Sequence, residues 1–125
     1  MANEWTLNFN LALAKGEIAQ TIHALTNKQW DMSGNAGGNP GYVEVGTAEE
    51  NISFGDITGN GVLLIVNLGS ESVQWGIDAS GIQAVGEIST TGPKFAFFEI
   101  KSGVTLRMQS LGAAAVPCWI GRYPT

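Results

Sequence analysis

Gly61-Val-Leu-Leu-Ile-Val-Asn-Leu68 begins the stretch that decides the fold, and Gly69-Ser-Glu-Ser72 and Val73-Gln-Trp-Gly-Ile77 follow it without a gap. The first segment is apolar on both faces, which is typical of a central strand covered by a second layer. Gly, Ser and Glu then form a tight turn, and the third segment is a second strand. Short strands that end at such residues indicate an all-β protein.

The segments near the C-terminus continue this pattern. Phe95–Ile100 and Val104–Gln109 are predicted strands, and Lys101-Ser-Gly103 joins them as a hairpin. Val116–Tyr123 is expected to close the sheet. Its Pro117 predicts an edge position or a bulge, because proline cannot donate a backbone hydrogen bond to a neighbouring strand.

The N-terminal segment alternates in the same way. Residues 4–14 carry large apolar side chains at every second position, namely Trp5, Leu7, Phe9, Leu11 and Leu13. A period of two puts them on one face of a strand. Alternation turns this face toward the core, and the same face is also an expected contact with other proteins if the chain assembles. Residues 17–26 fit a helix or a strand. The strand is favoured because Lys15-Gly16 makes a short turn and no capping residue precedes Glu17.

A long Gly- and Asn-rich loop is predicted over residues 31–41, next to Trp30. Loops of this length in compact domains tend to carry function, so we expect a surface arm or an inter-subunit contact. Tyr42–Val45 is a short predicted strand, Thr47–Glu50 is a single turn, and residues 82–91 are a loop or a weak strand.

Together these segments predict a single domain over residues 1–125. About eight short strands in a chain of this size favour a two-sheet antiparallel sandwich, and the form we expect is a jelly roll. Charged residues make up 14% of the chain and glycine occurs 17 times. This composition suits an all-β domain and does not suit a disordered chain.

The acidic balance of the chain argues against several partners. The formal net charge is −5, and the six Lys and Arg residues form no cluster. Nucleic acids and anionic membranes both require a basic face, so neither is an expected partner. The N-terminus lacks the features of a signal peptide, and the longest aliphatic run, Val62 to Val66, is too short to cross a bilayer. We expect a soluble protein made in a cytoplasm.

Residues able to support catalysis or bind metals are sparse. The chain has a single histidine, His23, and a single cysteine, Cys118, which cannot supply the three or four ligands of zinc. Cys118 lies in an apolar segment and is expected to be a buried thiol. Asp56–Asn60 comes nearest to a calcium loop, with an Asx turn as the favoured interpretation. Glu49-Glu50 are adjacent and point apart, unlike a glycosidase pair. We predict a protein that is not an enzyme and has no metal or cofactor.

Four tryptophans raise the alternative of a carbohydrate-binding module, in which exposed rings stack on sugars. Strand alternation turns Trp5 and Trp75 toward the core and leaves Trp119 undecided. Trp30, beside the loop, is the best candidate for an exposed ring. An exposed ring on a small protein marks an interface more often than a sugar site. The predicted interface residues are Trp5, Trp30, Met32, Asn35, Tyr42, Trp119 and Tyr123.

Three segments together have a familiar order. Val45–Ile57 leads into the strand–turn–strand unit Val66–Ile77, and Gly92-Pro-Lys-Phe-Ala-Phe-Phe-Glu-Ile-Lys-Ser-Gly-Val-Thr-Leu106 follows. This order resembles the small β-sandwich accessory virion proteins of tailed bacteriophages, in which the middle unit is a central hairpin. The resemblance covers residues 43–122 and rests on strand and turn motifs.

The departures from the family pattern are Gly69, where the family often has Asp, and Lys94, where it often has Glu. Neither change threatens the fold. The resemblance implies a non-enzymatic virion protein, either a cement or decoration protein on the capsid or a neck or tail component. Its implied partners are further copies of itself, as a dimer or trimer, and the major capsid protein or other virion proteins. The implied localisation is the virion, after synthesis in the host bacterial cytoplasm.

Overall fold

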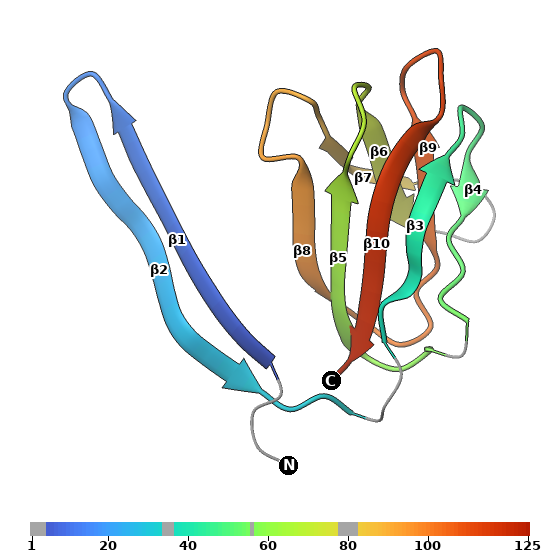
Figure 1. The fold of residues 1–125 in the computed structure, drawn as a ribbon, viewed down its shortest axis with the longest axis horizontal. Coiled ribbons are helices and arrows are strands. Elements are labelled where there is room, and N and C mark those ends of the chain that lie inside the picture. Colours follow the sequence, from blue (N-terminus) through green and yellow to red (C-terminus); the bar gives the residue numbers. More distant parts are fainter. Residues whose placement is uncertain (1–4, 34–36, 56, 78–82) are drawn as a thin grey trace. The chain divides into compact units, whose positions relative to one another are not determined.

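A computed structural model describes residues 5–33, 37–55, 57–77 and 83–125 (Figure 1). Within these ranges the chain forms ten strands and no helix, and therefore no helix that could span a membrane. The predicted all-β class is confirmed. Contacts divide the chain into two compact units, Met1–Ser33 and Gly34–Thr125.

The first unit is a β-hairpin. Strands β1 (Trp5–Lys15) and β2 (Ile18–Trp30) pair antiparallel, and Gly16 turns the chain with a φ of 60°. The strand favoured over a helix for residues 17–26 is therefore confirmed. The sequence predicts one sandwich over residues 1–125, whereas β1 and β2 form a two-stranded sheet of their own.

The second unit is a sandwich of two four-stranded sheets. One sheet has the order β3-β10-β5-β8 and the other the order β4-β9-β6-β7, with neighbouring strands antiparallel in both (Figure 1). The bounds are β3 Asn39–Val45, β4 Glu50–Asn51, β5 Gly61–Asn67, β6 Val73–Ile77, β7 Gln83–Ile88, β8 Phe95–Ile100, β9 Leu106–Ser110 and β10 Val116–Pro124. Eight strands in two sheets is the count of a jelly roll, and the jelly-roll form itself stays a prediction.

The core fills the space between these two sheets. It is a cluster of buried apolar side chains, and its fully enclosed members include Val45, Leu63, Ile65, Val73, Leu106, Met108, Val116, Cys118 and Ile120. Strand β5 lies between β10 and β8, and five of its seven residues are buried. Its predicted central position is confirmed. Trp75 also packs against the core, where its ring stacks on Phe98 at a centroid distance of 4.8 Å.

The two predicted hairpins are wrong, because each turn carries the chain from one sheet to the other. Strands β5 and β8 belong to one sheet, and β6 and β9 belong to the other. Both strands of each pair have an apolar face, and placing them in opposite sheets turns these faces toward each other across the core. Buried Asn67 stabilises the first crossing: its Nδ2 donates to the carbonyls of Glu71 (2.8 Å) and Ile88 (3.1 Å), and its Oδ1 accepts from Gly69 N (2.9 Å).

The edge position or bulge predicted from Pro117 is also wrong, because β10 pairs on both sides, with β3 and with β5, and neither register has a shift. Pro117 is tolerated here because pairing with β5 begins at Cys118 and Asn67. Next to Pro117 lies Leu68, beyond the end of β5, which donates its N–H to the Pro117 carbonyl at 2.9 Å. The missing proline N–H therefore lies on the β5 side, beyond the end of the β5–β10 ladder, while Pro117 itself is paired with Glu44 of β3.

The loop predicted over residues 31–41 is shorter in the structure, because β3 begins at Asn39. Gly41 adopts a φ of 85° and still pairs with Ile120, a backbone conformation that glycine permits. Residues 34–36 lie outside the described part of the chain. The weak strand proposed within residues 82–91 is present as β7.

Candidate interaction surface

The two outer faces of the sandwich differ in chemistry. The outer face of the sheet β4-β9-β6-β7 is mainly polar, with Gln74 Nε2 donating to Gln109 Oε1 at 2.8 Å and Val85 of β7 as an exposed apolar residue. On the same sheet the guanidinium of Arg107 lies 3.3 Å from the carboxylate of Glu49. A face that carries amides and an ion pair is satisfied in water and needs no covering layer.

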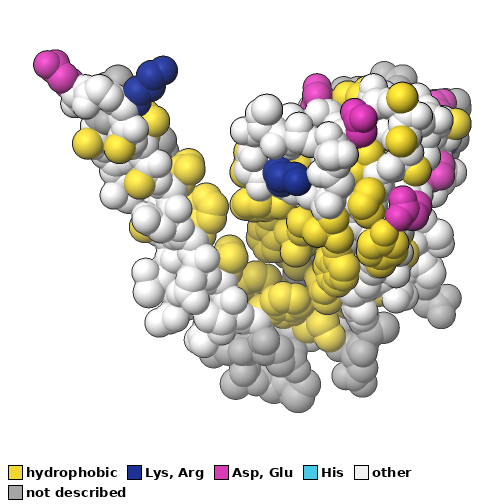
Figure 2. Space-filling model, turned by 45° about the horizontal axis from the view of Figure 1, so that its top comes forward, with side chains coloured by type: hydrophobic (Ala, Val, Ile, Leu, Met, Phe, Trp, Pro, Cys, Tyr) yellow, Lys and Arg dark blue, Asp and Glu magenta, His cyan; other side chains and the backbone are white. Residues whose placement is uncertain are grey.

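The outer face of the sheet β3-β10-β5-β8 is apolar. Side chains alternate along each strand, so the residues between the core positions point outward. Cross-strand pairs bring the outward residues into rows, such as Tyr42, Trp119, Val66 and Phe95 on four successive strands. We call this surface the apolar face, and its members are Tyr42, Leu64, Val66, Phe95, Phe97, Trp119 and Tyr123. Figure 2 shows hydrophobic side chains gathered on the sandwich surface.

Two aromatic rings of β10 are stacked on the apolar face. The ring centroids of Trp119 and Tyr123 lie 6.4 Å apart, with their planes inclined by 20°. Gly121 lies between them in sequence, and a Cβ at that position would overlap the end of the Trp119 ring. Glycine is therefore required here for the indole to lie along the strand. Burial raises the pKa of Tyr123, as expected for a phenol on an apolar surface.

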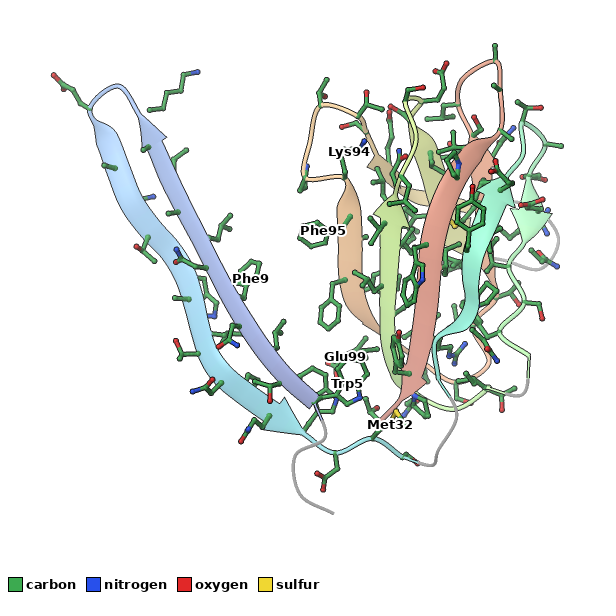
Figure 3. All side chains as sticks on the ribbon, in the orientation of Figure 1. Trp5, Phe9, Met32, Lys94, Phe95 and Glu99 are labelled. Atoms are coloured by element: carbon green, nitrogen blue, oxygen red, sulfur yellow. The ribbon has the colours of Figure 1, made fainter. Side chains whose placement is uncertain are left out.

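The edges of the apolar face are the most exposed. Tyr42 on the edge strand β3 is 61% exposed, and Phe95 and Phe97 on the opposite edge strand β8 are 45% and 40% exposed. Figure 3 shows the Phe95 side chain projecting from β8. Tyr42 donates a hydrogen bond to Glu44 Oε1 at 2.6 Å, which raises the pKa of the phenol because the carboxylate favours its neutral form.

The β1–β2 hairpin has an apolar side of its own. The rings of Trp5 and Trp30 stack at the open end of the hairpin, 5.8 Å apart and inclined by only 6°. Beyond them Phe9, Leu11 and Leu13 are 37%, 45% and 39% exposed. The expectation that this stripe faces the core is wrong, because these side chains are exposed and, within residues 5–33, the hairpin has no second layer. The other face carries small or polar side chains, at Thr6, Asn8, Asn10, Ala12 and Ala14.

The predicted interface residues fall into two groups. Tyr42, Trp119 and Tyr123 come together on the apolar face. Trp5 and Trp30 form the stacked pair of the hairpin, and the half-buried Met32 follows β2. Trp30 is not the exposed ring that the sequence suggests, because stacking on Trp5 leaves it half-buried. Asn35 lies outside the described residues.

Leu64, Val66, Phe95 and Phe97 belong to the apolar face and are absent from the predicted interface. The signal was present in residues 61–68, which are apolar on both faces. A sandwich has only two layers, so the second layer covers one face of this strand and the other face points outward. The outward residues of a strand that is apolar on both sides are therefore candidates for an interface.

The groups considered for catalysis belong to different strands and turns. Cys118 is fully buried, and burial, followed by the charge of Glu44, raises the pKa of its thiol to about 11. His23 is exposed on β2 opposite Leu11, and Glu49 is held by Arg107. Among the described residues no three His, Cys, Asp or Glu side chains are grouped so that they could hold a metal ion. Asp56, the first residue of the segment considered for calcium, lies outside the described residues.

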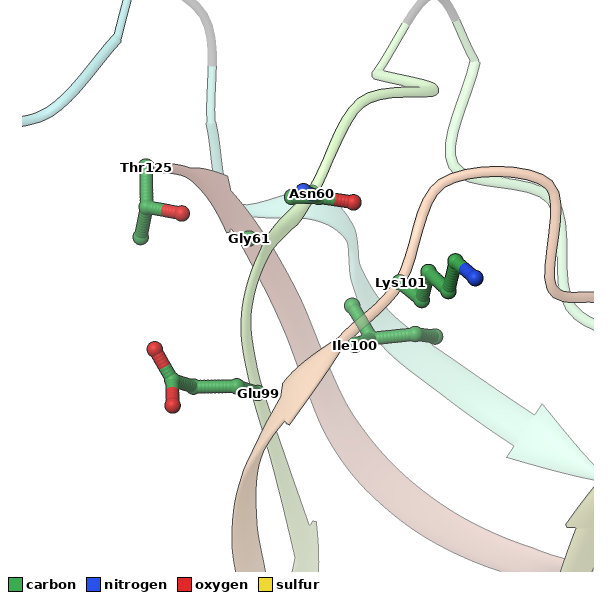
Figure 4. A pocket seen from close by; sticks show the side chains of 6 residues that line it. All are labelled: Asn60, Gly61, Glu99, Ile100, Lys101 and Thr125. Carbon is green, nitrogen blue, oxygen red and sulfur yellow. The ribbon is translucent and has the colours of Figure 1, made fainter.

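One pocket of about 350 Å³ opens at an end of the sandwich (Figure 4). Its lining residues are Asn60, Gly61, Glu99, Ile100, Lys101 and Thr125. The side chain of Asn60 is already engaged, because its Oδ1 accepts the Ser102 N–H at 2.7 Å. The pocket is largely open to solvent and has a lining of mixed polarity, unlike the enclosed apolar sites that small ligands prefer.

No protein-family model matches the chain, and no curated protein or solved structure matches it either.

Proposed function

We propose that this protein is a non-enzymatic structural protein of a phage virion, which associates with itself and docks on the capsid as a cement or decoration protein, or serves in the neck or tail. The observation that carries the proposal is the difference between the two outer faces of the sandwich. One is mainly polar, and the other presents seven apolar or aromatic residues that form the apolar face. An apolar patch of this kind on a small domain is characteristic of a protein-binding surface.

The composition of the apolar face suits protein contacts. Interface centres are enriched in Tyr, Trp and Phe, and the apolar face carries all three residue types. The sheet beneath it is rigid, because β10 and β5 are paired on both sides and anchored in the core. A rigid aromatic surface loses little conformational entropy when it binds.

The placement in a virion depends on the resemblance of residues 43–122 to accessory virion proteins of tailed phages. The assembly role and the apolar face support each other, since such a protein must bind neighbours in many copies. The test is mass spectrometry of gradient-purified virions together with imaging of particles that carry a label on this protein. Many copies per particle would support the proposal, and absence from the particle would end it.

A carbohydrate-binding module is the second candidate. It is favoured by the stacked Trp119 and Tyr123 rings on the outer face of the sheet, which could serve as a platform for sugar rings. Glycan arrays compare the protein with its Trp119→Ala and Trp30→Ala variants. A signal lost in Trp119→Ala and kept in Trp30→Ala supports a sugar site on the apolar face, and an array without signal rejects the candidate.

A further inference from the structure

The chain contains two surfaces of the same chemistry, both formed by aromatic and aliphatic side chains. One is the apolar face of the sandwich. The other is the apolar stripe of the hairpin, which is formed by Trp5, Leu7, Phe9, Leu11 and Leu13 on β1. Figure 3 shows the Phe9 side chain projecting from its strand. A two-stranded hairpin is at best marginally stable in water and needs a layer against its apolar side. The stripe therefore requires a binding surface.

The stripe is long enough to cover the apolar face. It runs over nine residues, from Trp5 to Leu13, and the aromatic residues of the apolar face on β10 run over five, from Trp119 to Tyr123. At about 3.4 Å per residue these lengths are roughly 27 Å and 14 Å. A hairpin of this length covers the apolar face from one end to the other.

The distribution of charge favours the hairpin over a second sandwich as the partner of the apolar face. Glu44 and Glu99 point outward at the edge strands of this sheet, and residues 34–125 contain eight acidic and four basic residues. Two such faces in contact would bring like charges together. Residues 5–30 contain two lysines and one glutamate, and Lys28 pairs with Leu7 and therefore shares the side of the stripe.

We propose that the apolar face binds the β1–β2 hairpin of another copy of this chain, so that copies assemble by exchanging hairpins. This inference rests on the proposed self-association and specifies its contact. Reciprocal exchange gives a dimer, and exchange in one direction around a ring gives a trimer. In either assembly each hairpin gains the second layer that its own unit lacks.

The test measures molar mass by size-exclusion chromatography with light scattering, using the full chain with a monomer mass of 13.2 kDa. Leu11→Glu places a charge on the stripe, and Phe97→Glu places one on the apolar face; both side chains are exposed in the structure. Each variant is expected to be monomeric at concentrations where the unmodified protein is a dimer or trimer. Ala12→Glu, on the opposite side of β1, and Val85→Glu, an exposed position of β7, are the matched controls and are expected to assemble normally.

Mixing the two defective variants distinguishes hairpin exchange from other contacts. The Leu11→Glu protein keeps an intact apolar face, and the Phe97→Glu protein keeps an intact hairpin. One contact of the proposed kind can therefore form in the mixture, and association is expected at concentrations where neither variant associates alone. Near-ultraviolet circular dichroism of each variant verifies that its sandwich is folded.

Three results would overturn hairpin exchange. These are a monomeric unmodified protein at millimolar concentration, assembly that survives both substitutions, and a mixture of folded variants that stays monomeric. The last two leave the proposed self-association intact and remove only this contact. A monomer in solution that is nevertheless found in purified virions rejects hairpin exchange and retains the virion role.

Discussion

Trp119 stacks on Tyr123 across Gly121, with ring centroids 6.4 Å apart. The two residues are four positions apart on β10, so their side chains leave the strand on the same side. A side chain at Gly121 would occupy the space that the indole fills. The aromatic part of the apolar face thus depends on a residue that has no side chain.

Gly121→Ala is expected to displace the Trp119 ring without unfolding the sandwich. The added Cβ would overlap the far end of the indole and lie 2.9 Å from Tyr123 Cε2, and both rings can rotate away. We expect a changed near-ultraviolet circular dichroism spectrum and a loss of about 1–2 kcal/mol in the free energy of unfolding. The control is Gly46→Ala, where a Cβ would meet nothing within 4 Å. An unchanged aromatic spectrum in Gly121→Ala would contradict the stacked arrangement.

Gly61→Ala tests a contact of a different kind, because the added Cβ would meet backbone atoms of β10 and no side chain. A Cβ at Gly61 would overlap the Tyr123 carbonyl oxygen and lie 3.2 Å from Pro124 Cα. The neighbouring strand cannot rotate away as a side chain can, so β5 and β10 must separate at this end. We expect a loss of about 1–3 kcal/mol in the free energy of unfolding, measured with urea.

Gly59→Ala is the matched control for this substitution. Its Cβ would meet nothing within 4 Å, and the Gly59 carbonyl that accepts a bond from Arg122 remains. A change within about 0.5 kcal/mol is expected for this variant. Equal losses in the two variants would mean that the close approach of Gly61 to β10 does not determine stability.

Much of this fold could be predicted from side-chain alternation, and the sheet assignment could not. The pattern in residues 61–77 correctly places two strands around a turn. It does not reveal that β5 and β6 lie in different sheets, since a short turn can join strands within a sheet or between sheets. In the structure the crossing is marked by Asn67, whose side chain donates hydrogen bonds to the carbonyls of Glu71 and Ile88.

Only part of the apolar face could be predicted from the sequence. Tyr42, Trp119 and Tyr123 stand out in the sequence because aromatic rings on strands are conspicuous. Leu64 and Val66 do not stand out, because aliphatic residues in a central strand look like core. Only the pairing of β5 with β10 and β8 shows that alternate residues of this strand face away from the core.

Asn67→Ala is expected to weaken the sandwich strongly. The amide group makes three hydrogen bonds in a buried position, with Gly69 N, Glu71 O and Ile88 O. Removing it leaves buried backbone groups without these partners, which costs about 2–4 kcal/mol in the free energy of unfolding. Asn60→Ala removes one exposed bond to Ser102 N and is expected to cost less than about 1 kcal/mol. Similar losses in both variants would reject the role of Asn67 at the crossing.

Cys118 is expected to make the free energy of unfolding depend on pH in the alkaline range. Its thiol is fully buried in the core, and burial raises its pKa from 9.0 to about 11. Between these two values the thiol of the unfolded chain loses its proton while that of the folded protein keeps it. The unfolded state then binds fewer protons, so the contribution of Cys118 to the free energy of unfolding is complete below pH 9 and declines as the pH rises toward 11.

The pKa values of Tyr42 and Tyr123 are also raised, so both tyrosines contribute to the pH dependence of stability. Comparison with Cys118→Ala isolates the contribution of the thiol. Urea unfolding of both proteins is measured at several pH values from 7 to 11. The unmodified protein is expected to be the more stable below pH 9, because the alanine leaves a cavity, and its advantage is expected to shrink above pH 9. A thiol reagent at pH 8 should modify Cys118 only after urea is added. An advantage that stays constant to pH 11, or rapid modification of the folded protein, would show that the thiol is accessible to water.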